Sequence, residues 1–143
     1  MCIIIVYGFA INGVGPISGN PCDATTADAL SAKVSVQFND ASEVGKTLVA
    51  ICDLYRGTTR INTSPLFSNQ FTVPYINAIT TFDIPFTGIQ ITPATYNFGS
   101  GGVSIHTPDL TSQYCYAVTS TRCTSIVITL AVCVNPVCNI GMT

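Results

Sequence analysis

The stretch Leu30–Phe38 reads Leu-Ser-Ala-Lys-Val-Ser-Val-Gln-Phe and alternates apolar and polar side chains at every step. Because successive side chains of a β-strand point to opposite faces, this pattern predicts a strand with one buried face and one solvated face. The segment Asn39-Asp40-Ala41-Ser42 follows and predicts a turn, since Asn, Asp and Ser favour turns. A core packed against one face of a β-sheet is therefore expected.

Further β-like segments follow along the chain. Thr47–Tyr55 is apolar on both faces, which predicts a central strand covered on two sides. Because proline is confined to strand edges and ends, the proline-punctuated middle of the chain predicts short strands. These are Gln70–Val73, Ile79–Ile84, Gly88–Thr92, Ala94–Phe98 and Val103–His106. About eight to ten short strands at close spacing predict an all-β fold, a single β-sandwich of jelly-roll or immunoglobulin-like type.

The C-terminal part predicts a hairpin formed by Gln113–Val118 and Cys123–Val134. In the second strand the even-numbered residues form the apolar face, so Cys123 and Cys133 are expected to point away from the core. A loop centred on Thr119 would place Cys115 opposite Cys123, where the two could bond. A register change of one residue removes that pairing.

The chain begins with an uncharged, largely β-branched run, Met1-Cys2-Ile3-Ile4-Ile5-Val6-Tyr7-Gly8-Phe9-Ala10-Ile11. The Gly- and Pro-rich segment 13–26 after it predicts a linker or long turn. We therefore divide the chain into residues 1–17, an N-terminal extended strand with its hinge, and residues 18–143, a β-sandwich domain. The run is shorter than the roughly 20 residues that a membrane-spanning helix needs. It can complete a sheet in its own domain or in that of a neighbouring copy.

The composition favours self-association and argues against nucleic acid as a partner. Charged residues make up 8% of the 143 residues, against roughly 25% in typical soluble domains. A surface so poor in charge favours association. The formal net charge is −2, and the five Lys and Arg residues are scattered along the chain. Without a basic patch to neutralise phosphates, nucleic-acid binding is not expected.

The cysteine content indicates an oxidising setting, outside the cell or on its surface. No Cys-x-x-Cys pair occurs and His106 is the only histidine, which argues against zinc, thioredoxin-like and haem sites. An odd number of cysteines leaves at least one free or bonded to another chain. The alternative is that several are small buried hydrophobes. The seven candidates for disulfides are Cys2, Cys22, Cys52, Cys115, Cys123, Cys133 and Cys138.

No catalytic constellation stands out, so neither enzymatic activity nor a cofactor or metal is expected. The acidic residues form no spaced motif, and a Cys–His pair involving His106 is less expected than a surface histidine near a turn. Segment 39–43 offers oxygens that could bind calcium, although turn chemistry explains the same residues. The six tyrosines could form a sugar-binding platform, but packing is their more usual role. Asn62-Thr63-Ser64 is a candidate N-glycosylation acceptor.

The N-terminal run, together with the β-pattern after it, resembles the donor strand of extracellular pilus and filament subunits. In those proteins an N-terminal extension fills a groove in the sheet of the next subunit. The chain is also similar to the jelly-roll subunits of bacterial spore appendages, which carry a cysteine-bearing N-terminal arm for covalent cross-linking. Cys2 stands where such an arm cysteine would, although this arm has one cysteine rather than a cluster.

The resemblance implies a structural subunit of an extracellular filament or pilus-like appendage that polymerises with copies of itself by strand addition. The alternation would place Ile3, Ile5, Tyr7 and Phe9 on one face, or Cys2, Ile4 and Val6 on the other. A secreted monomeric β-sandwich that binds glycans or cell surfaces is the alternative, as is a virus coat or tail protein. The residues assigned to the assembly strand are Ile3, Ile4, Ile5, Val6, Tyr7, Phe9 and Ile11.

Overall fold

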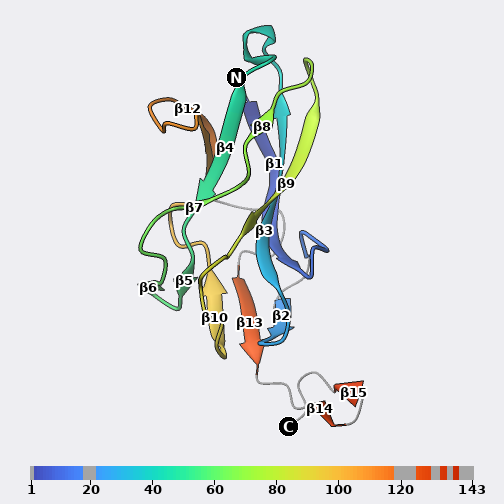
Figure 1. The fold of residues 1–143 in the computed structure, drawn as a ribbon, viewed down its shortest axis with the longest axis vertical. Helices are drawn as coiled ribbons and strands as arrows, with labels where there is room; N and C mark the ends of the chain where they lie inside the picture. Colours follow the sequence, from blue (N-terminus) through green and yellow to red (C-terminus); the bar gives the residue numbers. More distant parts are fainter. Residues whose placement is uncertain (1, 18–21, 118–124, 130–132, 135–136, 139–143) are drawn as a thin grey trace.

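The protein is all-β. The computed structural model describes residues 2–17, 22–117, 125–129, 133–134 and 137–138 (Figure 1). Its first elements are the strands β1 (Cys2–Ile11), β2 (Cys22–Thr25) and β3 (Leu30–Phe38), the short 3₁₀ helix η1 (Ala41–Glu43), and the strands β4 (Thr47–Cys52), β5 (Tyr55–Arg56), β6 (Thr59–Arg60), β7 (Leu66–Phe67) and β8 (Phe71–Thr72). The strands β9 (Ile79–Pro85), β10 (Ala94–Asn97), β11 (Val103–His106), β12 (Gln113–Ala117), β13 (Ser125–Thr129), β14 (Cys133–Val134) and β15 (Val137–Cys138) follow.

The first sheet has the strand order β1-β3-β9, with both pairs antiparallel. The bounds of β3 match the strand predicted from its alternating pattern, and its burial alternates residue by residue. Ala32, Val34 and Val36 are fully buried, whereas the polar residues between them are half-buried. The predicted turn after β3 is also confirmed, because the Asp40 carboxylate accepts hydrogen bonds from the Ser42 N–H and hydroxyl and caps η1.

Two further sheets have the orders β12-β11-β4-β7 and β2-β13-β10-β5-β6, with β8 also paired to β4. The central position predicted for the first part of Thr47–Tyr55 is confirmed, because β4 lies between β11 and β7. The predicted strand over 88–92 is wrong, since this segment is a connection without strand pairing. It is fastened by the Tyr96 hydroxyl, which accepts from the Thr92 N–H and donates to the Thr92 carbonyl, each at 2.8 Å. Such a tyrosine corner recurs in β-sandwiches.

The predicted C-terminal hairpin is wrong. β12 pairs with β11, while β13 pairs with β10 and, in parallel, with β2. β11 lies between β4 and β12, and β10 lies between β5 and β13. β4 leads directly into β5, and these two strands lie along one side of the segment formed by β10 and β11. β12 and β13 therefore lie one after the other along the opposite side of that segment, instead of folding back on each other. The alternation predicted for β13 is confirmed at Ile126 and Ile128, which are both buried.

The sheets pack around one apolar core, as a sandwich requires. Figure 1 shows β1, β3 and β9 running side by side, with β4 and β12 toward one end and β10 and β13 toward the other. Buried side chains from these three sheets meet in one cluster, among them Val34, Leu48, Ile84, Ile105 and Ile126. Among the described residues, no helix is long and apolar enough to cross a membrane.

Candidate assembly site

The N-terminal strand β1 completes the first sheet of its own chain. It pairs antiparallel with β3 from Cys2 opposite Phe38 to Ile11 opposite Leu30. The register shifts between Ile4 and Val6, because β1 contains an extra residue there. Such a β-bulge leaves one residue unpaired and moves every later side chain to the other face.

The bulge corrects the predicted faces of β1. Tyr7 and Phe9 lie opposite Val34 and Ala32 on the core face, and both are buried. Ile3 and Ile5 do not share that face, because they are 53% and 40% exposed. Cys2 is buried and Ile4 half-buried, whereas Val6 lies opposite Ser35 and Ile11 packs against the core. The core face of β1 therefore carries Cys2 and Ile4 before the bulge and Tyr7, Phe9 and Ile11 after it.

The aromatic residues of β1 reach across the core to the opposite layer. The Phe9 ring stacks on Phe98 with centroids 4.4 Å apart, and Tyr7 meets Phe98 edge-on at 5.2 Å. Phe9 also contacts Phe86 at 6.0 Å. Burial, with a smaller contribution from the nearby Cys52 thiol, raises the pKa of Tyr7 to about 12. Full burial of a large apolar side chain contributes roughly 1.5–3 kcal/mol, so these two residues anchor β1.

A disulfide joins the start of β1 to β12. Cys2 bonds to Cys115 with a Cα–Cα separation of 5.6 Å, and the bond closes a sequence separation of 113 residues. Cys115 lies opposite Ile105, a core residue of β11, so the bond links the core faces of two sheets. Because Cys115 is bonded to Cys2, the suggested bond between Cys115 and Cys123 does not form.

Of the other five cysteines, one is a free thiol, and for the remaining four the formation of disulfides stays a prediction. Cys52 was a candidate for a disulfide, but it is a free, buried thiol. Burial, and then the neighbouring Asp53, raise the pKa of this thiol. Cys123 lies outside the described residues. For Cys22, Cys133 and Cys138 the strand position is described but the side chain is not.

The segment after β1 folds back along it. The Ile17 N–H donates to the Phe9 carbonyl at 2.9 Å, and Ile11 and Val14 exchange two backbone hydrogen bonds. A Cβ at Gly15 would lie 2.9 Å from both the Ala10 Cα and the Phe9 oxygen, so only glycine fits there. Asn12 donates to the Asp28 carboxylate and accepts from the Ala29 N–H. Residues 12–17 therefore form a hydrogen-bonded segment that lies against β1.

The candidate glycosylation residue Asn62 is buried. Its side-chain nitrogen donates to Asp53 and to the Ser64 carbonyl, each at 2.8 Å, and its side-chain oxygen accepts from the Leu54 N–H. A glycan on that nitrogen would displace these bonds, so the folded site disfavours modification. The sequon signal instead marks a structural asparagine that fastens the end of β4.

The single histidine lies on the outer face of β11. Its Nε2 is 2.7 Å from the Ser104 hydroxyl, and burial lowers the pKa of His106. The buried Nδ1 has no hydrogen-bond partner within the described part of the chain, so the pair lacks the third group that orients the base beside an activated nucleophile. In that same part, no group of three or more His, Cys, Asp or Glu side chains could hold a metal ion.

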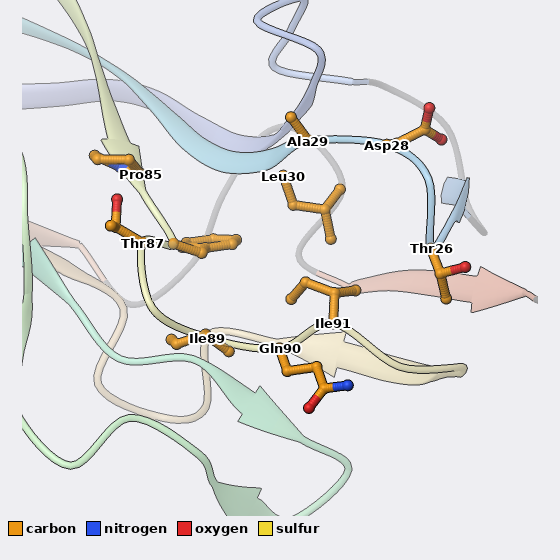
Figure 2. A pocket seen from close by; sticks show the side chains of 10 residues that line it. Thr26, Asp28, Ala29, Leu30, Pro85, Thr87, Ile89, Gln90 and Ile91 are labelled. Atoms are coloured by element: carbon orange, nitrogen blue, oxygen red, sulfur yellow. The ribbon is translucent and has the colours of Figure 1, made fainter.

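A cleft of about 530 Å³ opens between the β2–β3 turn and the β9–β10 connection. Figure 2 shows Leu30 and Ile91 pointing toward each other across it, while Asp28 and Gln90 point away. Phe86 adds an aromatic wall. Sequence reasoning did not find this cleft, because its lining residues come from segments more than fifty positions apart whose proximity depends on the β3–β9 pairing.

A scan against protein-family models and a search of curated proteins found no match for this chain. The features that bear on function are therefore β1, residues 12–17, the Cys2–Cys115 disulfide and the cleft. β1, residues 12–17 and the disulfide all concern how the N-terminal strand is fastened to the rest of the chain.

Proposed function

We propose that this chain is a structural subunit of an extracellular filament or pilus-like appendage, in which β1 is exchanged between copies. The observation that carries the proposal is the way in which β1 fills the core. It supplies two large aromatic anchors, Tyr7 and Phe9, from a strand that is followed by the segment 12–17. The same contacts could be made in the next copy, because domain swapping exchanges identical elements at low cost.

Strand exchange would propagate head to tail. If each subunit gave β1 to the next and received β1 from the previous one, the interface would be heterologous and the chain of subunits open. Main-chain hydrogen bonds along β3 would give affinity, and the pockets for Tyr7 and Phe9 would give register. Cys2 would meet Cys115 of the receiving copy in the position that the intrachain bond occupies in one subunit. The low charge of the surface supports association as well.

A specific observation favours a second candidate, the closed monomeric β-sandwich that binds glycans or cell surfaces. In one chain β1 already pairs with β3, and the Cys2–Cys115 bond fastens it there. A subunit closed in this way before export would not exchange its strand. The two candidates differ in one measurable respect, the identity of the chain that supplies the Cys2 partner.

The test uses two variants that each lack one half of the bond. Cys2→Ser keeps Cys115, and Cys115→Ser keeps Cys2, so neither can form the intrachain disulfide. The two proteins are mixed under an oxidising glutathione buffer, and mass spectrometry of non-reduced digests is used to find a Cys2–Cys115 peptide pair. That pair can arise only between chains. Strand exchange predicts its formation, together with fibres of the native protein in negative-stain electron microscopy.

The matched control is the double variant Cys2→Ser/Cys115→Ser mixed with either single variant, which supplies the remaining cysteines but not this pair. A mixture that yields no Cys2–Cys115 pair, combined with single particles in micrographs of the native protein, would reject strand exchange. The monomeric binding module would then be the better account.

A further inference from the structure

The turn that follows β1 is formed by Asn12 and Gly13. Both residues have positive φ angles, 53° and 78°, and they connect Ile11 to Val14, which exchange two backbone hydrogen bonds. This is a two-residue hairpin turn, for which Asn-Gly is a preferred sequence because both positions need a positive φ. Both residues are exposed, and the sequence contains no other Asn-Gly pair.

The side chain of Asn12 joins this turn to the segment before β3. Its Oδ1 accepts a hydrogen bond from the Ala29 N–H at 2.9 Å, and its Nδ2 donates to the Asp28 carboxylate at 3.1 Å. The Asn12 N–H also donates to the Ala29 carbonyl at 2.8 Å. The other oxygen of Asp28 accepts from the Thr25 N–H and hydroxyl. The Asn12 amide therefore faces a carboxylate whose second oxygen is already engaged by β2.

The same arrangement favours a chemical change at Asn12. The backbone nitrogen of the residue after an asparagine can attack the side-chain carbonyl carbon and close a five-membered imide ring. At Asn12 this nucleophile belongs to Gly13, which has no Cβ to hinder the attack and whose N–H donates no hydrogen bond within the described residues. Negative charge develops on Oδ1 as the new bond forms. The Ala29 N–H already donates to that atom, so it would stabilise this charge.

We propose that Asn12 is a site of spontaneous deamidation, and that the carboxylate formed there releases the turn from Asp28. In the first step the Gly13 nitrogen bonds to Cγ of Asn12 and loses its proton, and the side-chain amide leaves as ammonia. In the second step water opens the imide at either carbonyl, which gives aspartate or isoaspartate at position 12. The reaction consumes one water, releases one ammonia and needs no redox partner. It takes place within one closed chain, so it does not depend on strand exchange.

The product changes the electrostatics of the turn. An aspartate at position 12 has no donor in place of Nδ2, so two carboxylates would face each other at the contact that is now a 3.1 Å hydrogen bond to Asp28. Like charges this close disfavour each other. The Lys33 ammonium, which donates to the Gly13 carbonyl at 2.7 Å, is already shared with Asp83 at 3.6 Å. Isoaspartate also adds one carbon to the main chain of the turn, which disturbs the pairing of its flanking residues.

The test of the site follows two asparagines in the full-length native protein. The protein is incubated in mildly alkaline buffer at body temperature, and peptide mapping by mass spectrometry measures the conversion of each amide to a carboxylate. Asn77 is the internal control, because it is exposed and has a positive φ of 62° but is followed by the buried Ala78 instead of a glycine. A parallel sample in urea gives the rates in the unfolded chain.

Asn12 should convert in the folded protein to a mixture of aspartate and isoaspartate. Its rate should be roughly tenfold or more above that of Asn77, because one hydrogen bond to developing charge lowers a barrier by about that factor. Equal rates at Asn12 and Asn77 in the folded protein would overturn the proposal. So would an Asn12 that keeps its amide in the folded protein for a time in which it converts in urea.

The release of the turn is tested with variants that imitate the product. Asn12→Asp should accelerate hydrogen exchange of the amides at positions 12 and 14 roughly tenfold, because a hydrogen bond to a charged acceptor is lost. Asn77→Asp is the matched control, because the Asn77 side chain makes no hydrogen bond within the described residues. The pair Asn12→Asp/Asp28→Asn restores one amide opposite one carboxylate and should return exchange to the native rate.

Circular dichroism establishes that each of these variants folds. Native exchange rates at positions 12 and 14 in folded Asn12→Asp would show that the carboxylate does not release the turn. Fast exchange that persists in the folded double variant would show that repulsion from Asp28 is not the cause. Either result would overturn the second part of the proposal.

Discussion

β1 and β3 lie side by side in one sheet, yet they are held in different ways. β3 has hydrogen-bonded neighbours on both sides, and its burial alternates without interruption. Within the described part of the chain, β1 pairs along its length with β3 alone, contains a bulge, and is joined to β12 through Cys2. β3 is therefore fixed by main-chain pairing on both sides, whereas β1 depends on Tyr7, Phe9 and one covalent bond.

The largest expected effect is the removal of the Phe9 anchor. Phe9→Ala should lower the free energy of unfolding by about 3–5 kcal/mol, because a fully buried ring that contacts Phe86 and Phe98 is lost. Val36→Ala on β3 should cost about 2 kcal/mol, because less apolar volume is removed. Urea denaturation measures both. A smaller cost at Phe9 than at Val36 would contradict the anchor role.

Loss of the disulfide should come next. Cys2→Ser and Cys115→Ser should each lower the free energy of unfolding by about 2–4 kcal/mol, since the bond constrains a long loop of the unfolded chain. The double variant should cost no more than the single variants, because the bond is already absent in each. Hydrogen exchange should also accelerate in the β1 amides more than in those of the β3–β9 ladder. Additive costs would mean that the two cysteines act independently.

A third difference appears in alkaline solution. The pKa of Tyr7 is raised from 10.0 to about 12 in the folded protein, so the folded state binds this proton more tightly than the unfolded state does. Its stabilising contribution, on the order of 2–3 kcal/mol, is fully present below pH 10 and is lost as the pH rises toward 12. Tyr7→Phe should remove that part of the pH dependence. Denaturation curves between pH 9 and 12 make the comparison, and identical slopes would count against burial of the phenol.

The smallest effect is expected on the outer face of β1. Ile3→Ala should change the free energy of unfolding by less than about 0.5 kcal/mol, because the side chain is 53% exposed. Ile3 and Phe9 would share a face if the strand alternated without interruption, so this variant tests the bulge. A cost near that of Phe9→Ala would mean that the register runs on unshifted.

Sequence reasoning predicted β3 fully and β1 in part, and the two strands explain why. In β3 each polar residue separates two apolar ones, so a single register buries all the apolar side chains. In β1 three isoleucines follow one another, and such a run carries no periodic signal from which a bulge could be placed. The all-β class and the positions of β10 and β11 followed from proline and glycine spacing.

The pairing of distant segments was not predictable. β12 and β13 look like a hairpin because they are adjacent in sequence, but each is paired by a different part of the β10–β11 segment. The Cys2–Cys115 bond joins residues 113 positions apart in the sequence, and cysteine spacing alone does not determine connectivity. Asn62 carries the acceptor pattern of a surface residue, and only its three hydrogen bonds reveal that it is buried.

The alkylation rate of the buried Cys52 thiol can report how often the core of the protein opens. It lies close enough to the Tyr7 hydroxyl to affect its pKa, and it is shielded from solvent in the closed subunit. An alkylating reagent can reach it only when the surrounding core opens, so its labelling rate measures how often that happens. If the opening is the departure of β1, the residence time of the strand can be read from one peptide in a mass spectrum. The rate at which β1 leaves its own subunit, and not only its affinity for that subunit, would then decide whether the strand passes to a neighbouring copy.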